Sequence, residues 1–147
     1  VRQYELDELR NRVGMVLQKN VLFTGTIKEN LLWGNEQADD EEIERISTYA
    51  QADMFVKSFG DGYETMLDQG GVNLSGGQKQ RIGIARALYK DAEVLFFDEA
   101  TSALDSHTER EINAALQDLS DTHKELTMII IAHRESSLGF CDRIIDL

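Results

Sequence analysis

The chain has 147 residues, of which 41% are hydrophobic and 29% are charged. This length and composition fit one soluble globular domain, and no apolar run approaches the roughly 18 residues needed to span a bilayer. The formal net charge of −12 would repel a phosphate backbone, which disfavours DNA and RNA as partners. The single cysteine, Cys141, excludes an internal disulfide and a cysteine-based zinc site.

The chain starts with the charged stretch VRQYELDELR, which lacks an initiator methionine and does not have the character of a signal peptide. We therefore expect more of the domain to precede Val1. The next feature is RVGMVLQ, residues 12–18, an apolar run that predicts a buried strand followed by a loop. Further on, an acidic cluster precedes Ile43, Ile46 and Ala50, whose spacing predicts a helix with acids in its first turn.

The stretch NLSGGQKQR, residues 73–81, places Ser75, Gly76 and Gly77 directly ahead of a helical pattern. The apolar face of this predicted helix consists of Ile82, Ala85, Leu88 and Tyr89. Bare backbone N–H groups at a helix start, with a serine hydroxyl beside them, can bind an anion, and a Cβ would obstruct its approach. We therefore predict a phosphate-binding helix start here, in preference to a simple tight turn.

The last third of the chain predicts a β-α-β unit with parallel strands. The apolar runs at 94–97 and 128–132 are typical of strands buried on both faces. Between them, SHTE at 106–109 predicts a capping box that opens a helix reaching residue 119. The apolar stripe of that helix is Ile112, Ala115, Leu116 and Leu119. The C-terminal RIIDL, residues 143–147, is a candidate for one more strand.

Asp98 and Glu99 follow the first of these strands, and His133 follows the second. Because the carboxyl ends of parallel strands meet at the edge where open α/β sheets bind ligands, we expect these side chains to lie together. Asp98 offers a hard oxygen ligand for Mg²⁺, and Glu99 can orient or deprotonate a water molecule. An acidic pair alone is as often a helix cap, and a lone histidine is more often structural. All three at one edge favour a catalytic site.

The phosphate loop of nucleoside triphosphatases, G-x-x-x-x-G-K-[ST], is missing from the sequence. Gly71 and Gly76 have the glycine spacing, but Gly77 and Gln78 stand where lysine and Ser/Thr are required. The sequence therefore predicts part of a nucleotide site without the loop that holds the triphosphate.

Four motifs in one order resemble the nucleotide-binding domain of ATP-binding cassette (ABC) transporters over essentially the whole chain. They are VGMVLQKNVLFTGTIKENLLWG (13–34), LSGGQ (74–78), VLFFDEATSALD (94–105) and IIIAHR (129–134). The stretch LFTGTIKENLLWG is similar to the exporter branch of the family, where a membrane domain is fused ahead of the ATPase.

The resemblance implies an α/β fold with an incomplete P-loop NTPase-like parallel sheet and an inserted, mostly helical ABC subdomain. The phosphate loop (Walker A) and the aromatic residue that stacks on adenine would lie upstream of Val1. The implied parts are a core lobe with the Gln loop (1–19), the helical subdomain with the signature motif (20–90), and a core lobe with Walker B, D-loop and His switch (91–147).

The resemblance also implies roles for residues of the hydrolytic site. Gln18 would contact Mg²⁺ and the attacking water, and its loop would relay movement to the membrane domain. Asp98 would hold Mg²⁺ through water, and Glu99 would be the general base. His133 would bind the γ-phosphate of ATP and hold the catalytic geometry.

The remaining implied contacts cross to a second subunit. Ser75, Gly76, Gly77 and Gln78 would contact the γ-phosphate of ATP held by the opposite subunit. Asp105 would lie in the loop that crosses the dimer interface. The bare helix start would then be one half of a site that two chains complete.

The function implied is hydrolysis of ATP with Mg²⁺ between two head-to-tail subunits, identical or homologous, coupled to a transmembrane domain and to export. The location implied is the cytoplasmic face of the cell membrane, and we expect the chain alone to be inactive. One alternative is the ATPase domain of a non-transport ABC protein serving chromosome maintenance or DNA repair, which should lack TGTIKEN. Another is a non-catalytic interaction module, which a nucleotide titration would separate from the enzyme.

Two departures from the family pattern concern loops. Asn20 stands where the family often has proline, a change expected to alter loop stiffness only. Gln69 and Gly70 replace the acid and base of the G-E-R-G-like stretch that usually precedes the signature motif. This second change concerns a cross-subunit contact that couples to the membrane domain, and it leaves both an identical and a non-identical partner open.

Overall fold

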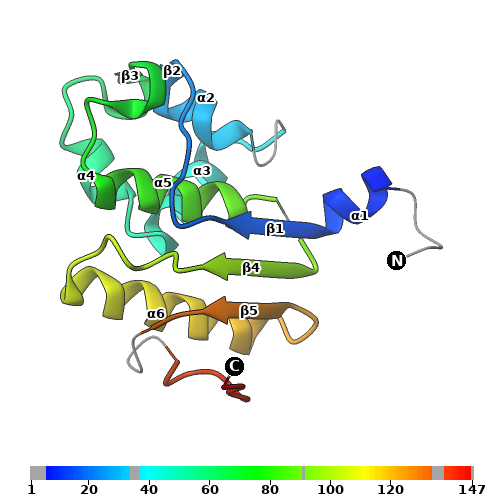
Figure 1. Ribbon diagram of the computed structural model, residues 1–147. Helices are drawn as coiled ribbons and strands as arrows, with labels where there is room; N and C mark the ends of the chain where they lie inside the picture. Colours follow the sequence, from blue (N-terminus) through cyan, green and yellow to red (C-terminus); the bar gives the residue numbers. More distant parts are fainter. Residues whose placement is uncertain (1–5, 34–36, 91, 134–137, 147) are drawn as a thin grey trace.

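The computed structural model describes residues 6–33, 37–90, 92–133 and 138–146. Three strands form a parallel sheet in the order β1-β4-β5 (Figure 1). They are β1 (Val13–Val16), β4 (Val94–Asp98) and β5 (Thr127–Ile131). The strands predicted within 12–18, 94–97 and 128–132 are confirmed, and so are the parallel pairing of the last two and the α/β fold class.

Two helices cover one face of this sheet, α5 (Gly76–Leu88) and α6 (Ser106–Thr122). Helix α5 approaches β1 so closely that a Cβ on Gly14 would lie 3.1 Å from the carbonyl oxygen of Ala87. On the same face, Leu95 and Phe97 are buried. A glycine in β1 therefore permits the close packing of helix on strand.

The opposite face of the sheet is not covered by the described residues. Met15, Phe96 and Ile129 align across the three strands in the register. Met15 is 55% exposed, Ile129 44% and Ile131 43%. The prediction that both apolar runs form strands buried on both faces is therefore wrong for this chain, because the helices pack on one face only.

The segment between β1 and β4 is mostly helical (Figure 1). Its elements are β2 (Gly25–Thr26), α2 (Ile27–Leu32), α3 (Asp40–Tyr49), α4 (Asp53–Lys57) and β3 (Met66–Leu67), with 3₁₀ turns at Gly62–Glu64 and Gln69–Gly71. The helix predicted behind the acidic cluster is confirmed as α3, with Asp39 as its N-cap and Ile43 and Ile46 buried. Strands β2 and β3 pair antiparallel as a small second sheet. A short helix, α1 (Leu6–Arg12), precedes β1.

The predicted start of α5 is confirmed, and its cap is a capping box. The backbone N–H of Gln78 donates to Ser75 Oγ at 3.2 Å, and the backbone N–H of Ser75 donates to Gln78 Oε1 at 2.9 Å. The two side chains thus satisfy backbone donors that the first helical turn leaves without partners.

The predicted capping box at the start of α6 is wrong. Asp105, not Ser106, is the N-cap, and its carboxylate accepts from the backbone N–H groups of His107 and Thr108. Glu109 is only 3% exposed, and its carboxylate accepts a hydrogen bond from Thr101 Oγ1 at 3.4 Å. The aspartate outcompetes the serine because it lies one position earlier and reaches two N–H groups at once.

The candidate C-terminal strand does not form within residues 143–146, which have no regular secondary structure. Ile144 and Ile145 are 57% and 65% exposed, so no neighbouring strand stabilises an extended pairing there. The last residue of that stretch, Leu147, and the last residue of IIIAHR, Arg134, lie outside the described residues. Within the described residues, none of the helices has the length and apolar character that a bilayer crossing requires.

Candidate functional site

Three side chains meet just beyond the carboxyl ends of the three parallel strands. Gln18 follows β1, Glu99 follows β4 and His133 follows β5. Gln18 Nε2 donates to Glu99 Oε2 at 2.8 Å, and His133 Nε2 lies 2.8 Å from Glu99 Oε1. The predicted meeting of Glu99 and His133 at this edge is confirmed. Gln18, proposed only from the resemblance, joins them although 81 residues separate it from Glu99 in sequence.

The backbone holds Glu99 in an uncommon conformation. Its φ is +48°, in the left-handed region that side-chain-bearing residues rarely adopt. The backbone N–H of Glu99 donates to the carbonyl of Ile131 at 3.0 Å, which extends the pairing of β4 with β5 by one residue. Such strain persists only where surrounding contacts impose it, and it is frequent at functional sites.

The Glu99 carboxylate keeps acceptor capacity for a further ligand. Its side chain is 24% exposed, and the two contacts to Gln18 and His133 use one position on each oxygen. An ionised carboxylate offers about four acceptor positions, so about two stay open. The His133 side chain is 81% exposed and therefore has room to turn toward a bound molecule.

Asp98 ends β4 and is suited to a Mg²⁺ site in which few of the ligands come from the protein. It alternates with Phe97, so it lies on the sheet face that the described helices leave open. Among the described residues there is no cluster of three or more His, Cys, Asp or Glu that could hold a metal ion. Protein Mg²⁺ sites commonly use one or two carboxylates, with water and phosphate as the other ligands. Asp98 fits such a site, with Gln18 as the nearby amide that the resemblance names.

The signature residues lie together at the start of α5, as predicted. Gly76 and Gly77 need no special backbone angle, and a Cβ on them would meet only ordinary contacts, 4.0 Å from Ala103 Cβ and 3.4 Å from Ala103 O respectively. Within the described part of the chain, no hydrogen bond joins Ser75, Gly76, Gly77 or Gln78 to the Glu99 cluster. Packing inside this chain therefore does not explain why the helix start is bare.

Asp105 has a structural role that the sequence analysis did not assign. Besides the two backbone bonds at the start of α6, its Oδ2 accepts the Thr108 hydroxyl at 2.7 Å. The hydrogen bonds from the Thr108 backbone and hydroxyl, with that from His107, lower the pKa of Asp105 to about 2. The carboxylate is thus ionised and engaged in helix capping. Its place at a dimer interface stays a prediction.

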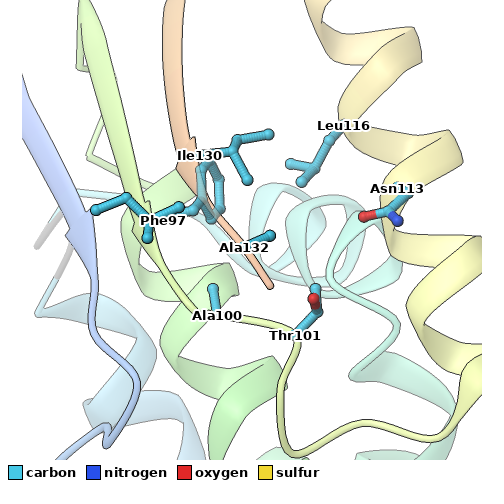
Figure 2. Close-up of a pocket in the computed structure, with 8 residues that line it drawn as sticks. Phe97, Ala100, Thr101, Asn113, Leu116, Ile130 and Ala132 are labelled. Carbon is cyan, nitrogen blue, oxygen red and sulfur yellow. The ribbon is translucent and has the colours of Figure 1, made fainter. Parts of the chain in front are cut away.

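A mostly apolar pocket lies between the sheet and α6 (Figure 2). Its lining is Phe97, Ala100, Thr101, Asn113, Leu116, Ile130, Ile131 and Ala132. The labelled side chains come from β4, the loop after it, β5 with the residue that follows it, and α6, and no charged group is among the lining residues. We interpret the pocket as incomplete packing of helix on sheet, because it lacks groups that would bind a polar ligand.

Sequence reasoning missed Arg86, near the end of α5. Its guanidinium donates to the carbonyl of Asn30 at 3.0 Å and to Asn30 Oδ1 at 3.1 Å, and lies 5.5 Å from the centre of the Phe23 ring. Burial lowers the pKa of Arg86. No local pattern marks this residue, because its hydrogen-bond partner Asn30 is 56 residues away in sequence.

The fold and the site define an α/β protein with a polar ligand-binding edge on a parallel sheet. The sequence matches the family described as ABC transporter over residues 1–102. The chain belongs to the ABC transporter family. Membership of this family implies ATP binding.

Curated relatives include a protein named for multidrug export and a flippase. The putative multidrug export ATP-binding/permease protein YgaD of Bacillus subtilis (strain 168) is 47% identical over 145 residues, 99% of this chain and 24% of the relative. An ATP-dependent lipid A-core flippase of Desulfotalea psychrophila (strain LSv54 / DSM 12343) is 43% identical over 145 residues, 99% of this chain and 25% of the relative. The chain thus spans about a quarter of the length of these curated relatives.

A solved structure has the same fold. The structure of a bacterial Atm1-family ABC exporter with ATP bound matches with a TM-score of 0.84 and 39% identity, over 90% of this chain and 23% of that chain. These comparisons support the exporter interpretation. They give no support to a role in chromosome maintenance or DNA repair.

Proposed function

We propose that this chain is part of the ATP-binding and ATP-hydrolysing domain of an ABC exporter, and that Glu99 is the general base. The observation that carries the proposal is the cluster of Gln18, Glu99 and His133 at the carboxyl edge of the sheet. The similarity to exporters over nearly the whole chain supports the reaction class.

In the proposed mechanism, a water molecule attacks the γ-phosphorus of ATP in line with the bond to the leaving oxygen of ADP. Glu99 takes the proton of that water, and the Gln18 amide orients the water beside the carboxylate. His133 turns from Glu99 to the γ-phosphate. Bound Mg²⁺, held by Asp98 through water, would neutralise phosphate charge. Catalysis of this kind comes mainly from positioning and electrostatic stabilisation.

The second half of the site would come from another ABC ATPase subunit. Ser75, Gly76, Gly77 and Gln78 would contact the γ-phosphate of the partner's ATP, and Asp105 would lie at the interface. The bare start of α5 supports this arrangement, because no packing contact with the described residues requires glycine at positions 76 and 77. ATP would close the dimer, and hydrolysis would reopen it.

Several features of the whole protein belong to the same proposal. We propose a transmembrane domain in the same transporter, a location at the cytoplasmic face of the membrane, and no nucleic-acid partner. The parts of this chain would be core at 1–19, helical subdomain at 20–90 and core at 91–147. The chain alone would hydrolyse ATP poorly, since half of each site would be missing.

The test of this proposal is Glu99→Gln in the full-length protein. We expect ATP turnover to fall by about 100- to 10,000-fold, because the amide cannot accept the proton of the attacking water. ATP-driven dimerisation should persist, since glutamine keeps the size of the side chain. The measurements are phosphate release and dimer formation with ATP.

A matched control is Glu111→Gln, which removes an exposed carboxylate 3.3 Å from His107 Nδ1 on α6. That variant should turn over ATP normally. Sustained hydrolysis by the Glu99 variant would remove Glu99 as the base, and absence of turnover in the unaltered protein would contradict the proposed function.

A further inference from the structure

Three residues spaced three apart on α5 form a stripe that contacts the segment after β1, and we call Gln80, Gly83 and Arg86 the Gln-loop stripe. Arg86 Nη1 donates to the carbonyl of Val21 at 3.1 Å. At Gly83, a Cβ would lie 2.3 Å from Asn20 Cγ, so any larger residue would displace the Asn20 side chain that packs there. The loop that carries Gln18 therefore rests directly on the helix that begins with the signature motif.

The member of the stripe nearest to Gln18 is Gln80. It is 2% exposed, and its Nε2 donates to the carbonyl oxygen of Leu17 at 3.2 Å. That carbonyl belongs to the same planar peptide unit as the backbone nitrogen of Gln18. Holding the carbonyl therefore fixes the orientation of the peptide from which the Gln18 side chain extends toward Glu99. Because a buried amide is costly to leave without a partner, the contact should persist.

We propose that Gln80 is a positioning residue of the hydrolytic site. It holds the Leu17 carbonyl so that the Gln18 amide stays within hydrogen-bonding distance of Glu99. This inference rests on the proposed function, in which Gln18 orients the attacking water. Gln80 does not touch the reacting atoms, so its effect on catalysis passes through Gln18.

The position of Gln80 on α5 has a second consequence. It lies two residues after Gln78, which would contact the partner's nucleotide in the proposed dimer. Helix α5 would then contact the partner's ATP through Gln78. Two residues later, through Gln80, the same helix supports the Gln loop of its own chain. A movement of α5 when ATP binds across the interface would shift Gln18 in its own site.

The test compares Gln80→Leu, Gln18→Ala and the double variant in the full-length protein. Leucine is similar in size but cannot donate to the Leu17 carbonyl. We expect Gln80→Leu to lower kcat for ATP by about 10- to 100-fold with KM for ATP nearly unchanged, because a displacement of about 1 Å can cost about 100-fold. The double variant should be no slower than Gln18→Ala alone. Gln80→Leu acts by displacing the Gln18 amide, and in the double variant that amide is already absent.

Tyr63→Phe is the control for lost stability alone. It removes the hydrogen bond from Tyr63 Oη to Asp53 Oδ1, 2.6 Å long, elsewhere in the mostly helical segment. We expect this variant to unfold at a lower temperature yet keep kcat. If Gln80→Leu does not fold, Gln80→Met replaces it, since methionine keeps the length of the side chain but has no hydrogen-bond donor.

The possible outcomes distinguish failure of the positioning role from failure of the proposed function. Losses that add in the double variant, an unchanged kcat in the Gln80 variants, or failure of both Gln80 variants to fold would overturn the positioning role. Those results in a protein that hydrolyses ATP would leave the proposed function intact. An unaltered protein without ATP turnover would overturn the proposed function and this inference together.

Discussion

At the scale of single residues, the geometry of the Glu99 side chain depends on contacts with residues that follow two other strands. Its backbone has a φ of +48°, and its carboxylate lies 2.8 Å from both Gln18 Nε2 and His133 Nε2. Each neighbour follows a different strand of the sheet, so the geometry of the cluster depends on correct strand pairing. A carboxylate held in this way needs little reorganisation when a ligand binds, which suits the general-base role that we propose for Glu99.

Ser75 offers a residue-scale test of the two-chain site. Ser75→Arg places a long cationic side chain at the start of α5, where the serine now caps the helix. In mixed dimers with one unaltered subunit, we expect hydrolysis to be lost at the nucleotide bound by the partner. The measurement is ATP turnover in dimers that carry Glu99→Gln in one chosen subunit, so that a single site is observed at a time.

The control for this experiment is Ser58→Arg, because Ser58 is an exposed serine just after α4. It should not affect turnover at either nucleotide. Damage confined to the nucleotide held by the altered subunit itself would refute the cross-subunit role of the signature motif.

At the scale of elements, the two long helices begin with different caps. The start of α5 followed from sequence, since Ser75, Gly76 and Gly77 precede a helical pattern, and the structure shows that Ser75 and Gln78 form a capping box there. The same pattern at Ser106 and Glu109 misled, because Asp105 caps α6 and Glu109 is buried. A local pattern therefore names candidates for a cap, and the hydrogen bonds that form in the folded chain show which residue serves.

The cap of α6 predicts a pH-dependent contribution to stability. The folded-state pKa of Asp105, about 2, is below its ordinary value of 3.8, so its contribution is present above about pH 4 and is lost as pH falls toward 2. Asp105→Ala should therefore lower the thermal unfolding midpoint at pH 7, and the difference from the unaltered protein should shrink as pH falls. Thermal unfolding between pH 7 and pH 2 measures this difference.

Asp118→Ala on the same helix is the matched control, because the Asp118 carboxylate accepts no hydrogen bond within the described residues. Its effect on the midpoint should be small. A difference between Asp105→Ala and the unaltered protein that stayed constant down to pH 2 would show that the ionised cap is not the source of the stability.

At the scale of the whole molecule, the sheet has one covered and one open face. Met15, Ile129 and Ile131 are each more than two-fifths exposed on the open face. Exposed apolar surface of this kind is typical of an interface. We expect the 147-residue chain, taken alone, to associate with itself as its concentration rises, as sedimentation velocity can measure.

Charge on the open face should prevent that association. Ile129→Lys with Ile131→Lys should keep the chain monomeric, because desolvating two ammonium groups opposes contact between the faces. Met54→Lys is the control, since Met54 is 77% exposed on α4, outside the sheet. Monomeric behaviour of the unaltered chain at high concentration would contradict the prediction.

Much of this protein was determined by sequence alone, because the signals are local. Periodicity placed α3, α5 and α6, apolar runs placed the three strands, and the order of motifs indicated the family. Parallel pairing followed from the β-α-β order, and it brought Glu99 and His133 to one edge.

Only the tertiary structure decided the contacts between residues far apart in the chain. It joined Gln18 to Glu99, placed the buried Gln80 against the Leu17 carbonyl, and bonded Arg86 to the Asn30 carbonyl of α2. It also left one sheet face open, which apolar content could not reveal. The physical reason is that a side chain's partner across 56 to 81 positions depends on how whole elements pack, and short sequence patterns do not encode that packing.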